Sequence, residues 1–254
     1  MRRVHPLLAA ILLCGCLPAT AHATQRVRLD ATLTPERLGQ GTTVGFGFQI
    51  AAPPGRVPPP LTSIDVRYPR DLGIALSGLG LATCSQAFLE GAERGECPPN
   101  SRMGYGSALA EIPIGPLILR ERASIAVFRA PTREGHLALL FYAAGKSPVS
   151  TEIVFPGLLL PTPGTFGGDI SMNIPLVPSL PGAPDVAVVR LSSTIGPQHL
   201  TYYEHIRGRT IAYRPKGIML PNACPRGGFR FSASFSFEDG SHTTANHSVP
   251  CPTS

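Results

Sequence analysis

The sequence predicts an all-β fold of immunoglobulin-like sandwich character, built as two packed sandwich units and stapled by disulfides. Many short segments alternate apolar and polar residues with a period of two, which is the pattern of half-buried strands. The 254 residues include 28 prolines and 27 glycines, and these separate the segments from one another. No helical periodicity persists beyond about two turns. Strands are therefore the expected elements throughout.

The C-terminal segment shows this pattern most clearly. Every second residue from Phe229 to Phe237 is apolar, and four of these are phenylalanine. Because successive side chains of a strand point to opposite faces, the phenylalanines share one face, which we expect to lie in the core. Glu238–Ser241 supplies a turn, and Cys224 and Cys251 flank the two strands. The segment therefore predicts a disulfide-closed β-hairpin.

The other candidate strands show either the same alternation or a short continuous apolar run. With the C-terminal pair included, their expected ranges in chain order are Arg26–Leu33, Thr43–Ile50, Ser63–Tyr68, Met103–Ile112, Ile118–Phe128, His136–Ala143, Thr151–Phe155, Asp169–Ile174, Val186–Ser193, Arg209–Tyr213, Phe229–Phe237 and His242–Val249.

One helical turn is expected from Cys84 to Gly91. Ser85 is placed to cap its start, and a glycine follows Glu90 at its end. The turn lies inside the loop that Cys84 and Cys97 would close.

Proline-rich breaks divide the strands at residues 51–60, 156–164 and 175–184. The second break gives the expected domain boundary. It separates a β-sandwich unit over residues 24–160 from a β-rich unit over residues 161–254, and a single domain is the alternative.

The N-terminus has the three parts of a secretory signal peptide over residues 1–23. Arg2 and Arg3 are followed by an apolar stretch, and Ala21-His22-Ala23 forms a small-residue cleavage site. The alternative is a lipobox around Cys16, which would make the protein a membrane-tethered lipoprotein. Either interpretation predicts that the protein folds outside the cytoplasm.

Four cysteines remain beyond the signal, at positions 84, 97, 224 and 251. An even number in an exported chain favours disulfides, and four cysteines allow three connectivities. Each neighbouring pair flanks a short segment, which favours Cys84 with Cys97 and Cys224 with Cys251. Neither pair has metal-finger spacing, so these cysteines are expected to be structural staples.

The charge balance argues against a nucleic-acid partner. The formal net charge is +6, and it comes almost entirely from arginine, since Lys146 and Lys216 are the only lysines. The arginines are scattered and form no patch. Envelope polymers or another secreted protein are the partners left open, and a membrane is expected only if Cys16 is lipidated.

No catalytic motif stands out in the sequence. His199 and His205 are the candidate metal ligands, because a strand from His199 to His205 would place both on one face together with Tyr203. The alternative interpretation of this segment is an exposed aromatic-rich loop or edge strand. The sequence gives no Gly-x-Ser-x-Gly elbow and no His-Glu-x-x-His motif, and no cofactor is expected.

Two blocks carry a resemblance to a known group. They are Cys-x(12)-Cys-Pro-x-x-Ser-x-x-Gly from Cys84 to Gly104, and the closing Phe-x-Phe-x-Ala-x-Phe-x-Phe-x-Asp-Gly-Ser segment with its Cys-Pro flanks. Together they resemble uncharacterised exported proteins of GC-rich actinobacteria. The resemblance implies a secreted β-rich protein with paired cysteines, and it brings no catalytic or binding residues with it.

These observations lead to one functional expectation and two alternatives. We expect a non-catalytic secreted or cell-envelope protein with a structural or binding role. The first alternative is a secreted hydrolase or metal-dependent enzyme that uses the segment from His199 to His205. The second is the lipoprotein tethered through Cys16.

Overall fold

Strands make up most of the structure, as the period-two patterns predict. A computed structural model describes residues 25–74, 82–91, 97–147, 150–179, 182–196 and 199–252. Its strands are β1 (Arg26–Thr34), β2 (Gly41–Ala51), β3 (Leu61–Pro69), β4 (Gly73–Ile74), β5 (Arg102–Ile114), β6 (Leu117–Arg133), β7 (His136–Gly145), β8 (Glu152–Leu160), β9 (Phe166–Asn173), β10 (Ala187–Ile195), β11 (Tyr202–Ile206), β12 (Arg209–Tyr213), β13 (Ile218–Met219), β14 (Phe229–Phe237) and β15 (His242–Val249). The helical elements are α1 (Gln86–Gly91) and a 3₁₀ turn, Pro99–Ser101.

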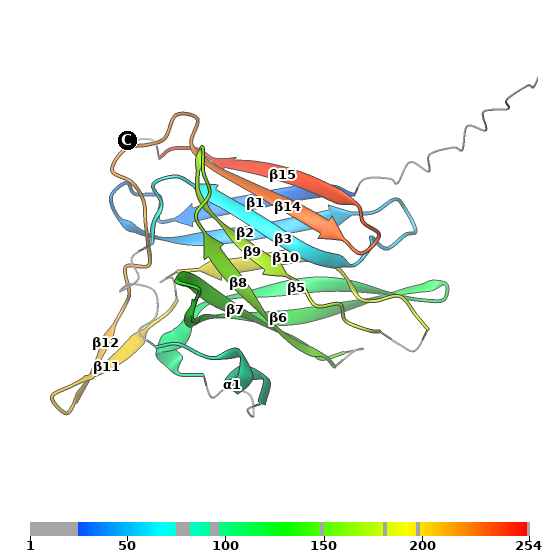
Figure 1. The fold of residues 1–254 in the computed structure, drawn as a ribbon, viewed down its shortest axis with the longest axis horizontal. Helices are drawn as coiled ribbons and strands as arrows, with labels where there is room; N and C mark the ends of the chain where they lie inside the picture. The colour runs from blue at the N-terminus through cyan, green and yellow to red at the C-terminus, as the bar shows by residue number, and fades with distance from the viewer. Residues whose placement is uncertain are drawn as a thin grey trace, which may run out of the picture.

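Within the described residues, 13 strands form one antiparallel sheet. The strand order is β15-β14-β3-β9-β8-β7-β6-β5-β10-β2-β13-β4, and β1 pairs with β2. The sheet curls on itself in a barrel-like form, which brings β1 beside β15 (Figure 1). The strands β11 and β12 form a separate two-stranded ribbon that projects from this body (Figure 1).

The all-β class is confirmed, but the immunoglobulin-like sandwich is not. A sandwich needs two facing sheets, whereas here the hydrogen-bonded order runs continuously from β15 to β2. Strands of the two expected units alternate in this order. β14 pairs with β3, and β10 pairs with both β2 and β5. The pairing therefore crosses the expected boundary at residue 160 several times.

The phenylalanine face of β14 lies in the core, as predicted. Phe229, Phe231, Phe235 and Phe237 are each at most 3% exposed. β14 pairs with β15 through a turn in which the Asp239 carboxylate accepts a hydrogen bond from the Ser241 backbone N–H, at 3.0 Å. The Cys224–Cys251 disulfide closes the hairpin, which confirms this pairing.

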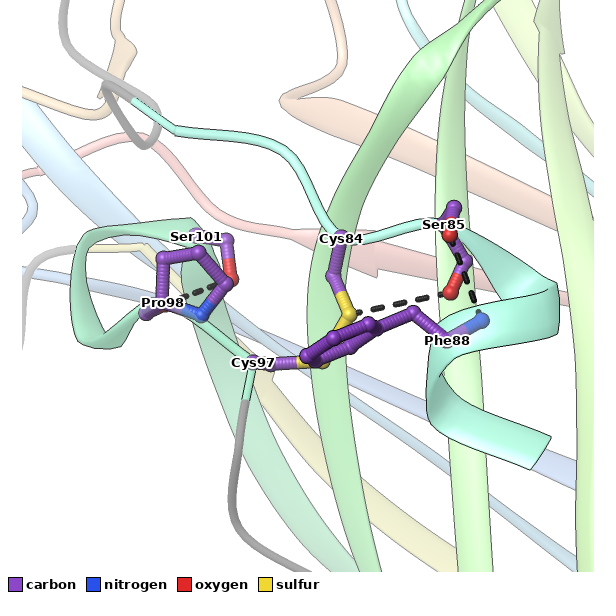
Figure 2. Close-up of a disulfide and its surroundings, with 6 residues drawn as sticks. All are labelled: Cys84, Ser85, Phe88, Cys97, Pro98 and Ser101. Carbon is purple, nitrogen blue, oxygen red and sulfur yellow. Dashed lines mark hydrogen bonds between the residues drawn. A yellow bond between two sulfur atoms is a disulfide. The ribbon is translucent and has the colours of Figure 1, made fainter. Parts of the chain in front are cut away.

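The Cys84–Cys97 disulfide is also confirmed, and it holds a loop against the outer face of the sheet. The Cys84 backbone N–H donates to the Arg129 carbonyl of β6 at 2.8 Å, and α1 lies against β8. Figure 2 shows the bridge with α1 beside it. There Ser85 Oγ accepts a hydrogen bond from the Phe88 N–H at 3.2 Å, as the expected cap requires. In the 3₁₀ turn that follows, the Ser101 hydroxyl donates a hydrogen bond to the Pro98 carbonyl at 2.6 Å.

A small apolar cluster explains why the outer face of the sheet carries this loop. Ala130, Ala138 and Leu140 point away from the sheet interior and are nevertheless buried. Phe128, Val154 and Leu158 pack against them. Strands β6, β7 and β8 are thus apolar on both faces. The inner face is buried in the core, and the outer face needs another segment of chain to shield it from water.

The break between strands that was expected to begin at residue 156 begins only after Leu160, because β8 continues through Pro156 to that residue. Pro156 pairs with Leu140 of β7, whereas the ladder between β8 and β9 starts only at Gly157. A proline has no N–H to donate, so it is tolerated where a strand has no neighbour on one side. β4, β11 and β13 are strands that the sequence analysis did not predict.

The predicted signal peptide (residues 1–23) and Cys16 lie outside the described residues. Among the helices that the structure describes, none has the length and apolar character needed to cross a bilayer. The two disulfides indicate an oxidising, extracytoplasmic environment.

Candidate functional site

The inner face of the curled sheet lines an apolar cavity. Its wall draws on most of the strands that surround the interior, including β2, β3, β5, β6, β7, β8, β9, β10 and β14. The period-two rule places the residues: on β7, Leu137, Leu139, Phe141 and Ala143 point inward, while Ala138 and Leu140 point to the outer cluster. Side chains far apart in the sequence therefore meet at one site.

The cavity has a volume of about 120 Å³, and only apolar atoms are exposed on its wall. Ser193 is one of the polar lining residues, and its hydroxyl already donates to the Phe46 carbonyl at 3.1 Å. An apolar cavity of about 150 Å³ stays dry and takes up benzene or xenon. The site thus has the size and wall chemistry of a small apolar binding site.

The interior is filled on one side and hollow on the other. Between β1, β2, β14 and β15, phenylalanine rings pack closely, and the Phe48 and Phe235 rings meet edge to face at 5.1 Å. Several inward side chains of β9 and β10 are only half-buried. Ile170, Leu191 and Ile195 are examples. The aromatic stripe of β14 therefore reaches the cavity only through Phe231, which forms part of its wall.

Stacked rings shape one wall of the cavity. The Phe141 and Phe155 rings lie parallel at 5.4 Å on neighbouring strands. Gly157 makes room for them, because a Cβ atom there would lie 2.8 Å from the Phe141 ring and 3.1 Å from Met172. A larger residue at position 157 would push these side chains into the cavity.

Tyr68 brings a titratable phenol to the cavity wall. Burial raises the pKa of this phenol, and the Asp169 carboxylate on the neighbouring strand raises it further. The neutral phenol is therefore the favoured form in the fold, in keeping with an apolar wall.

The two histidines that the sequence singled out lie in different settings. His199 precedes β11 with a positive φ of 62°, and its ring is tilted against the Tyr105 ring at 6.5 Å. His205 lies on β11, and its Nε2 is 3.1 Å from Thr210 Oγ1 on β12. The strand begins only at Tyr202, so the alternation that would have placed both imidazoles on one face does not extend to His199.

Within the described part of the chain, no three His, Cys, Asp or Glu side chains come together as a group able to hold a metal ion. The four cysteines at 84, 97, 224 and 251 are held in the two disulfides. The arrangement that does converge on one place is the apolar cavity.

The cavity was not predicted from the sequence, although most of the strands that form its wall were. Period-two alternation tells which residues face inward, such as Phe46 and Phe48 of β2. It does not tell whether facing side chains meet or leave a space. The sizes and positions of residues on opposite walls decide that, and these depend on the strand order.

Comparison with known proteins finds no counterpart: no family model, no curated protein and no solved structure matches the chain.

Proposed function

We propose that this protein is a secreted, non-catalytic binding protein that holds a small neutral apolar molecule inside its curled sheet. The observation that carries the proposal is the cavity of about 120 Å³, whose wall exposes apolar atoms only. The signal-like N-terminus and the two disulfides support secretion.

The packing of the interior supports a ligand. Protein interiors are close-packed, and apolar side chains that line a space without neighbours forgo dispersion contacts. A ligand that fills the space restores the missing contacts and binds the folded state only.

The wall chemistry selects the class of ligand. A carboxylate or ammonium buried against this wall would lose its hydration without gaining a partner, which is strongly unfavourable. A neutral ring or short hydrocarbon loses no hydrogen bond on entering. We therefore expect toluene or hexane to bind and hexanoate at neutral pH to be rejected.

The test compares ligand-induced stabilisation in matched variants. Ala143 lines the cavity, whereas the neighbouring Ala144 points to the opposite face of β7. Toluene at saturation is expected to raise the melting temperature of the wild-type protein by a few degrees. Ala143→Leu should fill part of the space and lose most of that rise, while Ala144→Leu should keep it.

Circular dichroism verifies that each variant is folded, and Ala143→Met offers a more flexible side chain if the leucine is not accommodated. Titration calorimetry with toluene and hexanoate supplies an independent affinity. The proposal is wrong if toluene fails to stabilise the wild-type protein, or if Ala143→Leu and Ala144→Leu respond equally.

A further inference from the structure

The ribbon of β11 and β12 exposes apolar side chains at a distance from the cavity. Tyr203 is 50% exposed, Ile206 45% and Ile211 46%. The register pairs Glu204 with Ile211 and Ile206 with Arg209, so both isoleucines lie on one face of the ribbon. Figure 1 shows this ribbon standing away from the curled sheet. Exposed apolar groups gathered on a projecting element mark an interaction surface.

The segment that carries these apolar side chains is rich in cations. Between Leu200 and Gly217 the chain carries one carboxylate, Glu204, which is half-buried, and four exposed cations, Arg207, Arg209, Arg214 and Lys216. Arg207 and Gly208 form the two-residue turn at the tip, and both have positive φ, 48° and 76°. Arg207 and Arg209 therefore flank the tip next to Ile206.

The base of the ribbon is fixed to the body of the protein. Asn100 holds Tyr203 by two hydrogen bonds: its side-chain N–H donates to the Tyr203 carbonyl at 2.5 Å, and its oxygen accepts from the Tyr203 N–H at 3.0 Å. The Tyr202 hydroxyl donates to the Arg102 carbonyl at 2.6 Å, and the Tyr202 ring packs edge to face on Tyr213 at 5.8 Å. The exposed tip therefore extends from a base that contacts the body of the protein.

From this combination we propose that the tip of the β11–β12 ribbon docks on an anionic lipid surface. The two isoleucine side chains insert at the boundary of headgroups and acyl chains, and the arginines at the tip pair with the anionic headgroups around them. This contact needs no lipid on Cys16, in contrast to the sequence-based expectation that a membrane is a partner only if Cys16 is lipidated.

A comparison within the molecule favours this element over the other exposed hairpin. At the β5–β6 turn, Leu117 is 63% exposed and Ile118 40%. Arg120, the first cation that follows in the chain, is ion-paired with Glu111 at 3.0 Å. From residue 111 to residue 122 two carboxylates balance two arginines, so this hairpin has exposed apolar groups without an excess of positive charge on its own strands and serves as the control.

The position of the ribbon relates it to the cavity. β10 ends at Ile195 and β13 begins at Ile218, and both residues line the cavity. The ribbon is the segment of chain between these two strands. Docking through its tip would therefore hold the cavity-forming sheet one ribbon length from the lipid surface.

The test measures binding to vesicles by the protein after export, and its gene encodes Cys16→Ser so that no lipid can be attached at that position. Vesicles of phosphatidylcholine with 30% phosphatidylglycerol are compared with phosphatidylcholine alone in a sedimentation assay. We expect at least tenfold tighter binding to the anionic vesicles and a loss of affinity with added salt.

Two ribbon variants separate charge from apolar insertion. The double variant R207Q with R209Q should weaken binding at least tenfold, because each arginine near an anionic surface contributes about fivefold. The double variant I206S with I211S should also weaken binding at least tenfold, because it removes the apolar side chains that insert. The control L117S with I118S should bind within about twofold of the wild-type protein, since it changes an apolar tip without the cationic surround.

Four outcomes would overturn the proposal. The first is that the protein shows no saturable binding to anionic vesicles, and the second is that the control variant loses as much affinity as the ribbon variants. The third is that the isoleucine substitutions leave vesicle binding unchanged. The fourth is that light scattering shows a dimer of the wild-type protein and a monomer of I206S with I211S. The third would indicate a soluble polyanion as the partner, and the fourth a second copy of the chain. None of them depends on the cavity, so this proposal and the proposed function fail separately.

Discussion

Tyr68 shows how a single residue couples the cavity to pH. Its phenol lies on the cavity wall, and burial together with Asp169 raises its pKa. In the unfolded chain the phenol loses its proton near pH 10. Between that pH and the folded pKa, the unfolded state has released a proton that the folded state still binds, so rising pH favours unfolding. The stabilisation is complete below about pH 10 and is lost as the pH rises through the folded pKa.

Tyr68→Phe is therefore expected to flatten the alkaline decline in stability. The substitution removes the titrating group and keeps the ring that packs on the wall. Urea unfolding from about pH 8 to pH 11 measures the free energy of unfolding of both proteins across the ordinary range of tyrosine titration.

Asp169→Asn is the control, because it removes the second cause of the pKa shift and leaves burial in place. Its alkaline decline should fall between those of the wild-type protein and Tyr68→Phe. Parallel curves for the wild-type protein and Tyr68→Phe would contradict the assignment.

Pro156 shows a limit of interpreting single residues from sequence. A proline is normally a sign that a strand ends, but at this position β8 continues to Leu160. The neighbour on the β9 side begins to pair only at Gly157. Whether a proline ends a strand depends on where the adjacent strand starts, and the local sequence does not contain that fact.

At the scale of elements, the β14–β15 hairpin was the most predictable part of the fold. The Phe229–Phe237 alternation sets the buried face, Asp239 and Gly240 suit the turn, and the flanking cysteines lie close enough to bond. All of these signals are local in the sequence. Of the β11–β12 ribbon only β12 was predicted as a strand. The Arg207-Gly208 turn is not one of the residue pairs common in two-residue hairpin turns, and Tyr202–Ile206 was considered as part of a longer segment that includes His199.

Cys224→Ser should cost about 3.5 kcal/mol of stability in oxidising buffer, because the bond closes a loop with a sequence separation of 27. In reducing buffer the wild-type protein lacks the bond as well, so the difference should nearly vanish. Differential scanning calorimetry with and without reductant measures both melting shifts.

Cys251→Ser removes the same bond and should give the same shift as Cys224→Ser. Unequal shifts would show that one sulfur has a further role. A Cys224→Ser shift of the same size with and without reductant would refute the view that the bond stabilises the hairpin.

At the scale of the molecule, strand pairing ties together the two halves that the sequence analysis separated. β3 lies between β14 and β9, and β10 lies between β5 and β2. Each half of the chain therefore supplies strands that complete the sheet of the other half. The hollow interior needs both halves, since its wall includes β2 and β3 as well as β8, β9 and β10.

We accordingly expect a chain limited to residues 24–160 to remain unfolded. It would leave β3 without β14 and β9, and both β2 and β5 without β10, exposing unpaired edges and apolar side chains. Proton–nitrogen correlation spectra of the fragment and of the full chain, both oxidised, give the measurement.

Narrow amide dispersion in the fragment, with a single cooperative unfolding transition in the full chain, is the expected result. A dispersed spectrum and a cooperative transition in the fragment would instead establish an independent unit over residues 24–160.

The sequence by itself determined most of the strand positions and the buried face of β14, and it favoured the two disulfide pairings that the structure shows. These follow from rules that act over a few residues: a side-chain period of two, turn residues between strands, and cysteines near each other in the chain. Only the tertiary structure decided the strand order, the curling that brings β1 beside β15, the separate settings of His199 and His205, and the cavity. Each of these depends on pairing between segments far apart in the chain, where many registers bury similar apolar area and the sequence pattern alone does not choose among them.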